Sequence, residues 1–284
     1  MHMLKIRQIL QSILWRISPR LCLHAHFFKQ RGYFPNFQNP MDLSEIILSE
    51  ILSGEICKYA PFVDKLTVRE HITAWGLGKY LPELYGTWNS AEEINFDILP
   101  EAFALKTNHG CGHHYLCPNK KFLDSKKARE VIAEALRLRF GNIEKQYDCI
   151  TPRCFAEEYI QDTRGGGQPL DYKFMCCDGT IRCVLICSER DTGTRLATYD
   201  LQWNRLEWIR DFEKSTHEFE RPQNFDEMIK IAETIAKQFT HVRVDLYSLP
   251  SGKIYIGELT FTPQGGIMSY FTNSAIKALG HVEK

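Results

Sequence analysis

The chain has 284 residues, with 35 Lys and Arg against 35 Asp and Glu, so its formal net charge is zero. Nucleic-acid-binding proteins normally carry a basic excess, so this balance argues against nucleic acid as a partner. The chain is 44% hydrophobic and long enough to bury a full core, and it has no run of about 18 apolar residues of the kind that spans a membrane.

Ten cysteines include no CxxC pair and no framework spacing, and no cleavable secretion signal precedes them. We therefore expect free thiols in a cytoplasmic protein. Cys111, His113, His114 and Cys117 lie close together in the sequence and suggest a zinc site as an alternative. Structural zinc sites usually show paired spacings, which this cluster lacks.

Residues 4–28 carry apolar residues at helical spacing, interleaved with basic ones. One interpretation is a basic amphipathic helix that makes a peripheral contact with a membrane surface. The other, and the more usual for such segments, is a helix packed on its own domain. A second helix is predicted over 42–53, so residues 1–60 are expected to form an N-terminal helical segment.

The next region combines a lysine before a helix, Lys65, with a strand over 103–106 that runs into a loop. Gly110 and Gly112 in that loop let backbone N–H groups approach phosphate oxygens, and Lys106 at the strand end adds a positive charge. No GxxxxGK[ST] sequence occurs, so this is not a Walker loop. A solvated lysine and a plain hairpin turn remain the alternatives.

Two amphipathic helices are predicted over 125–140 and 225–239. Between them, residues 152–160 form an apolar strand, and the polar, glycine-rich segment 161–170 reads as either a loop that closes over substrate or a tolerated surface insertion. The segment that follows predicts two strands joined at Asp178-Gly179, a strong turn signal.

The C-terminal hairpin concentrates charge. Arg243 and Asp245 share one face of its first strand, and a four-residue loop would place Arg243 opposite Glu258. Asp245, Glu258 and Thr260 would then converge, as oxygen ligands do around magnesium; the alternative is a simple cross-strand pair between Arg243 and Glu258. The glycines at 265–266 are typical of a backbone that passes close to a ligand.

Taken in order, the short motifs of the chain are DK at 64–65, LK and the glycine loop at 105–112, EEYI at 157–160, DYK at 171–173, RVD at 243–245 and GELTFTPQGG at 257–266. This series resembles that of the ATP-grasp superfamily, and more closely its TupA-like branch, which is named for teichuronopeptide biosynthesis. The resemblance implies an α+β ATP-grasp fold, with antiparallel sheets in a small ATP-binding lobe (61–156) and a large lobe (157–284) enclosing a nucleotide cleft.

The resemblance also implies roles for individual residues, with ATP and Mg²⁺ as cofactors. The implied nucleotide-binding residues are Lys65, Lys106, His109, Gly110, Gly112, Glu157, Glu158, Tyr159, Ile160, Asp171 and Lys173. The implied metal ligands are Asp245, Glu258 and Thr260, and the implied catalytic residues are Arg243 and Lys106. Thr260 stands where the superfamily usually has asparagine.

The activity implied is that of an ATP-dependent carboxylate–amine ligase, in which ATP activates a carboxylate as an acyl phosphate that an amine then attacks. The branch name points to an amide on a uronic-acid-containing cell-surface polysaccharide or its precursor. Two alternatives stay open: a kinase or sugar transferase of surface-glycan biosynthesis, and an inactive nucleotide-binding scaffold anchored through residues 4–28.

Overall fold

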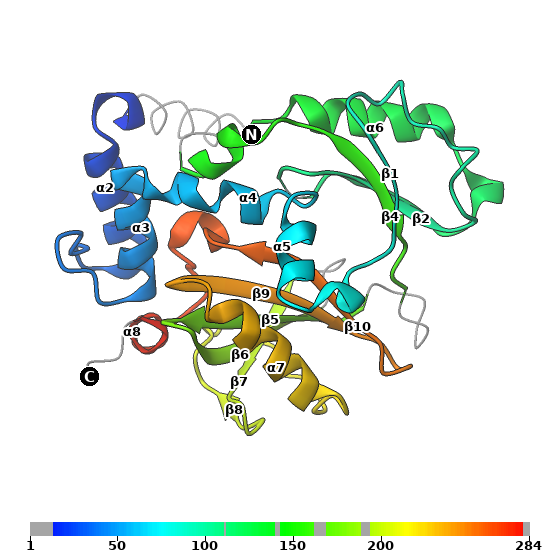
Figure 1. The fold of residues 1–284 in the computed structure, drawn as a ribbon. Helices are drawn as coiled ribbons and strands as arrows, with labels where there is room; N and C mark the ends of the chain where they lie inside the picture. Colours follow the sequence, from blue (N-terminus) through cyan, green and yellow to red (C-terminus); the bar gives the residue numbers. More distant parts are fainter. Residues whose placement is uncertain (1–13, 111, 140–142, 162–168, 189–193, 281–284) are drawn as a thin grey trace.

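The computed structural model describes residues 14–110, 112–139, 143–161, 169–188 and 194–280. Two separate antiparallel sheets form the body of the molecule, and each has its own helix packed against it (Figure 1). The two-lobed α+β arrangement expected from the sequence is therefore confirmed.

The smaller sheet has the strand order β1-β4-β2-β3. Its strands are β1 (Leu84–Trp88), β2 (Phe103–Thr107), β3 (His114–Cys117) and β4 (Cys154–Glu158). Helix α6 (Ser125–Arg137) buries Ala128 and Ile132 against Phe103 and Leu105 of β2, which gives this lobe its own core. The helix ends three residues before the expected position because Leu138 leaves the helical conformation. The boundary expected between residues 156 and 157 falls within β4.

The larger sheet has the order β10-β9-β5-β6-β7-β8. Its strands are β5 (Asp171–Cys177), β6 (Thr180–Ser188), β7 (Arg195–Tyr199), β8 (Arg205–Leu206), β9 (His241–Ser248) and β10 (Ile254–Thr260). Asp178 and Gly179 both have positive φ angles, 52° and 70°, as a tight hairpin turn requires. Helix α7 (Phe225–Ala236) buries its predicted apolar face, including Met228 and Ile235, against this sheet.

Helices α2 (Pro19–Arg31), α3 (Leu43–Ser53) and α8 (Asn273–Leu279) pack together at one side of the larger sheet (Figure 1). Asp42 and Glu45 form a capping box at the start of α3, since the Asp42 side chain accepts a hydrogen bond from the Glu45 N–H at 2.8 Å. These local signals explain why the helix begins where the sequence predicts.

The buried Arg31 ties α2 to the C-terminal segment. Its guanidinium donates to the carbonyl oxygens of Phe271 at 2.7 Å and Met268 at 2.8 Å, and also to that of Ile267. These three buried carbonyl groups thereby gain hydrogen-bond donors inside the molecule. The N-terminal helices are thus part of the main core and not a separate appendage.

Short helices connect these elements, and α4 and α5 lie between the two sheets (Figure 1). They are η1 (Glu55–Tyr59), α4 (Ala60–Val63), α5 (Val68–Ala74), η2 (Gly78–Tyr80), η3 (Lys120–Phe122), η4 (Lys145–Cys149) and η5 (Pro263–Gly266). Within the part of the chain that the structure describes, no helix is long and apolar enough to cross a bilayer.

The register of the β9–β10 hairpin differs from the prediction. Asp245 pairs with Glu258, and Arg243 pairs with Thr260 and not with Glu258. The cause is a bulge at Gly257, which shifts the ladder between Ile256 and Glu258. A side chain at Gly257 would stand 2.8 Å from the ring of Tyr247, so glycine at this position leaves room for that ring.

Candidate functional site

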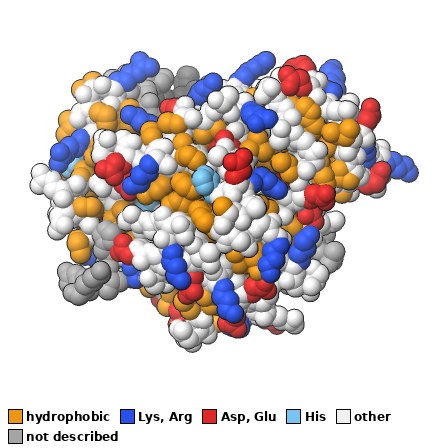
Figure 2. Space-filling view, viewed as in Figure 1, with side chains coloured by type: hydrophobic (Ala, Val, Ile, Leu, Met, Phe, Trp, Pro, Cys, Tyr) orange, Lys and Arg blue, Asp and Glu red, His pale blue; other side chains and the backbone are white. Residues whose placement is uncertain are grey.

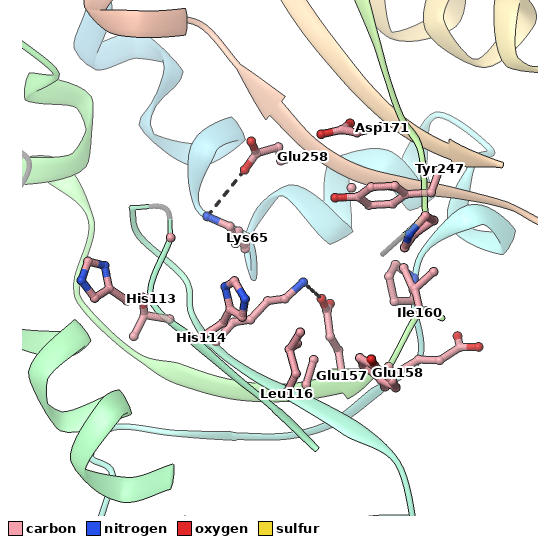
Figure 3. A pocket seen from close by; sticks show the side chains of 18 of the residues that line it. Lys65, His113, His114, Leu116, Glu157, Glu158, Ile160, Asp171, Tyr247 and Glu258 are labelled. Atoms are coloured by element: carbon pink, nitrogen blue, oxygen red, sulfur yellow. Dashed lines mark hydrogen bonds and ion pairs between the residues drawn. The ribbon is translucent and has the colours of Figure 1, made fainter. Parts of the chain in front are cut away.

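A cavity of about 250 Å³ opens between the two sheets. Its walls come from the β2–β3 hairpin and β4 on one side and from β5, β9 and β10 on the other (Figure 3). The predicted site residues that line it are Lys65, Lys106, Gly110, Gly112, Glu157, Glu158, Tyr159, Ile160, Asp171 and Glu258. Segments that are distant in the sequence therefore meet at this place.

The two predicted lysines approach the cavity from different elements. Lys65 Nζ donates to the carbonyl oxygen of Gly110 at 2.5 Å and lies 3.9 Å from Glu258 Oε2 (Figure 3). Lys106 Nζ donates to Glu157 Oε1 at 2.6 Å. Each ammonium group thus has a partner, but both remain partly exposed and available to an anion.

The glycine-containing loop is held by a residue that the sequence analysis did not single out, Asn108. It is 1% exposed, and its side chain donates to Asp64 Oδ2 at 3.0 Å, while its carbonyl oxygen accepts from the Lys65 N–H at 2.9 Å. Asn108 therefore couples the loop to the segment that carries Lys65. The sequence signal that could have indicated Asn108 is its position, since it is a polar amide between a buried strand and a glycine loop.

Glu157 and Glu158, on the strand that the resemblance assigned to adenine, point in different directions. Glu157 is buried between Lys106 and Arg69, whose Nη1 is 3.7 Å from Glu157 Oε2. Glu158 instead accepts hydrogen bonds from Tyr255 and from Lys253, at 3.0 Å for the latter. Glu157 thus pairs with Lys106 at the cavity, whereas Glu158 takes part in a contact that joins the two sheets.

Asp245 is enclosed by cations. Its oxygens accept two hydrogen bonds from Arg243, each at 2.7 Å, and one from Lys173 at 2.5 Å; Lys173 also contacts Asp171 at 2.5 Å. Burial alone would raise the pKa of Asp245, but the charges of Arg243 and Lys173 outweigh it and hold that pKa below its usual value. The carboxylate is therefore ionised.

Arg243 links this buried cluster to the cavity. Its Nη2 donates to Thr260 Oγ1 at 3.0 Å and to Glu258 Oε1 at 3.4 Å. Glu258 lines the cavity with its side chain 35% exposed, whereas Asp245 and Thr260 lie behind it. Of the three predicted metal ligands, Glu258 is the one placed to meet a ligand directly.

The described residues contain no group of three or more His, Cys, Asp or Glu side chains arranged to hold a metal ion. Glu258 fits a magnesium ion carried in by a nucleotide, because one carboxylate plus phosphate oxygens is a usual magnesium environment. The oxygens of Asp245 could join only if Lys173 or Arg243 released them. Cys111 of the alternative zinc cluster lies outside the described residues.

Three further predicted features are placed as follows. His109 does not line the cavity; it is 2% exposed, its Nε2 lies 3.4 Å from the Leu138 carbonyl oxygen, and burial lowers its pKa. The glycines at 265–266, expected to pass close to a ligand, do not line this cavity, and a side chain at Gly266 would stand 2.8 Å from Ile47 of α3. Most of the loop 161–170 lies outside the described residues.

Comparison with solved structures finds distant likenesses. D-alanine–D-alanine ligase from Bacillus anthracis shares 17% identity over 81% of this chain and 61% of that one, with a TM-score of 0.43. N5-carboxyaminoimidazole synthetase from Staphylococcus aureus, in complex with ADP, shares 14% over 78% and 53%, with a TM-score of 0.47. The chain thus spans somewhat more than half the length of these two structures, and no curated protein matches it.

The sequence profile described as TupA-like ATPgrasp matches residues 45–283, which is most of the chain. Its match includes every motif that carried the resemblance, from the lysine segment at 64–65 to the hairpin at 243–266. The two antiparallel sheets of the structure agree with that assignment. The protein belongs to the TupA-like ATP-grasp family.

Proposed function

We propose that the protein is an ATP-dependent carboxylate–amine ligase that works through an acyl phosphate. The observation that carries this proposal is one cavity in which Lys65, Lys106 and Glu258 converge from both lobes. The polar groups of this cavity can bind a triphosphate, and its apolar wall can contact a nucleotide base. A mainly apolar lining with a few polar groups is the composition expected of a small-molecule site.

In this proposal the phosphates of ATP lie against Lys65, Lys106 and the glycine loop, since the two lysines line the same space as Gly110 and Gly112. The adenine lies along the strand end at 157–160, and Asp171 receives the ribose. Leu116 and Ile160 supply apolar surface beside it (Figure 3).

The chemistry balances in two steps. A carboxylate oxygen of the substrate attacks the γ-phosphorus and ADP leaves; the amine nitrogen then attacks the acyl carbon, phosphate leaves and the amine loses a proton. Phosphoryl transfer depends on positioned positive charge more than on a protein nucleophile. Lys106 lies at the cavity wall for this task. Arg243 donates to Asp245 and Thr260 and approaches the cavity through its contact with Glu258.

Magnesium bound with the nucleotide would neutralise phosphate charge and act as a Lewis acid. Glu258 is the carboxylate that would hold it at the cavity, with Asp245 and Thr260 behind as the further proposed ligands. Arg243 contacts all three residues, so it fixes their positions relative to one another.

For the carboxylate we propose a uronic acid of a cell-surface polysaccharide or its precursor, made in the cytoplasm where ATP is available. The support is the family, whose namesake process joins such a carboxylate to an amine. The discriminating assay is ADP release with uronates and amines supplied separately and together. Release that requires both supports the ligase, whereas ATP consumption without any carboxylate would favour a kinase.

The assignment of Glu258 is tested separately with Glu258→Gln, which keeps the size and removes the charge. Turnover should fall by at least about a hundredfold, as for the loss of a charged group at a phosphoryl-transfer centre. The exposed Glu220→Gln is the matched control and should keep full turnover. Unchanged turnover of Glu258→Gln would remove this residue from the site.

A further inference from the structure

Charge is distributed very unevenly along the chain. Residues 1–41 hold six of the 35 Lys and Arg and none of the 35 Asp and Glu, and the first acidic residue is Asp42. Arg16, Arg20 and Lys29 are exposed on and beside α2. The surface of this helix is therefore basic in a protein whose total charge is zero.

Large apolar side chains are exposed on the same helix. Leu21 is 60% exposed and Phe28 45%, and their spacing of seven residues places them on one face of α2. Ile17, 74% exposed, lies just before the helix, on the other side of its N-cap Ser18. Phe34, 65% exposed, stacks on Phe28 with ring centroids 4.6 Å apart and continues that face. The opposite face of α2 packs into the core through Cys22, Leu23 and Phe27.

Exposed apolar side chains are concentrated in this part of the chain. Of the nine large hydrophobic side chains that are exposed in the described residues, five lie between positions 17 and 41. Single exposed apolar residues are normal on protein surfaces, but a contiguous set indicates an interaction site. The two faces of α2 thus have different partners, one being the protein core.

We propose that this surface, made of Ile17, Leu21, Phe28 and Phe34 with Arg16, Arg20 and Lys29, rests on an anionic lipid surface. Aliphatic and aromatic side chains bordered by basic residues alone are the composition of an interfacial helix, in which apolar groups enter the lipid boundary and cations meet the headgroups. A protein partner would not require that acidic residues be absent over 41 positions. The contact is peripheral, since no described helix can span the bilayer.

The location of α2 is compatible with catalysis at a membrane. The helix lies at the side of the larger sheet near α3 and α8, whereas the strands that line the cavity, β2 and β10, lie towards the other side (Figure 1). On the face seen in Figure 2, acidic and basic side chains are mixed, so no single charge dominates there. Docking through α2 therefore leaves the cavity open, and this inference does not depend on the proposed ligase activity.

The test is co-sedimentation of the full chain with vesicles of phosphatidylcholine alone or with about one third phosphatidylglycerol. We expect binding to the anionic vesicles only, weakened by added salt. The double variant Leu21→Ser and Phe28→Ser should lose binding at least tenfold, as expected when two large apolar side chains no longer enter the lipid. The matched control, Phe122→Ser with Phe212→Ser, changes two side chains that are 77% and 67% exposed elsewhere and should bind as wild type does.

Charge is tested by Arg20→Glu against Lys79→Glu, whose side chain is 70% exposed on another element. The first should weaken binding and the second should not. All variants retain residues 1–13, and unchanged thermal unfolding verifies the fold. Absent binding of wild type, equal loss in both double variants, or binding that survives Leu21→Ser and Phe28→Ser would each overturn the proposal. So would a wild-type dimer that this double variant converts to a monomer, because the face would then be a contact between copies.

Discussion

The sharpest stability prediction concerns Lys173, which lies between two buried carboxylates. Its side chain is 13% exposed and its Nζ is 2.5 Å from both Asp171 and Asp245, whose side chains are 5% and 2% exposed. Lys173→Met removes the charge but keeps an unbranched apolar stem of similar length. The change therefore tests the electrostatic contact with little effect on packing.

The expected loss follows from the contacts. Removing one partner of a buried ion pair costs about 3–5 kcal/mol, because the remaining charge stays desolvated. Arg243 still donates two hydrogen bonds to Asp245, so that carboxylate keeps strong partners. We therefore expect a loss of about 3 kcal/mol, near the lower end of that range.

The assay is urea unfolding near neutral pH, followed by tryptophan fluorescence and by circular dichroism so that the two lobes can be compared. Lys79→Met is the control, since Lys79 is exposed, and it should change the free energy of unfolding by less than about 0.5 kcal/mol. A loss below about 1 kcal/mol for Lys173→Met would refute the reasoning, because the ammonium would then not be compensating buried charge.

Three further predictions follow from contacts elsewhere. Gly257→Ala should disrupt the bulge, since the new Cβ would stand 2.8 Å from the ring of Tyr247. The nucleotide affinity of this variant, measured by calorimetry, should fall at least tenfold, and an affinity equal to that of the wild type would contradict a role for the bulge. Arg31→Met should cost more than about 3 kcal/mol in urea unfolding, because three carbonyl groups lose a buried charged donor; a loss under 1 kcal/mol would contradict this. Burial raises the pKa of Cys154 to about 11, so iodoacetamide near pH 8 should label the exposed Cys149 well before Cys154 in the native protein, and equal rates by mass spectrometry would contradict the burial.

Several elements could be predicted because their signals are local. The helix over 42–53 carries its own capping box, the α6 and α7 segments carry apolar residues at helical spacing, and Asp178-Gly179 specifies a tight turn. Each of these patterns is complete within a few residues of the chain. The order of charged motifs likewise indicated the family before any geometry was known.

The hairpin register could not be predicted in the same way. Alternation along β10 implies a regular ladder, and a single extra residue at Gly257 changes which side chain faces which. Glycine permits a bulge but does not demand one. The predicted cross-strand position of Arg243 was therefore wrong, although the contact considered between Arg243 and Glu258 does form, at 3.4 Å. The contact of Arg243 with Thr260 was not expected.

The sequence by itself determined the periodic elements, the charged residues available to a nucleotide site and the family to which they belong. Tertiary structure alone decided that Asp245 is enclosed by Lys173 and Arg243 while Glu258 faces the cavity. It also decided that Lys65 comes within 3.9 Å of Glu258, a residue far along the chain. The physical reason is that periodicity and capping act between neighbours in sequence, whereas burial and ion pairing depend on which distant segments pack together.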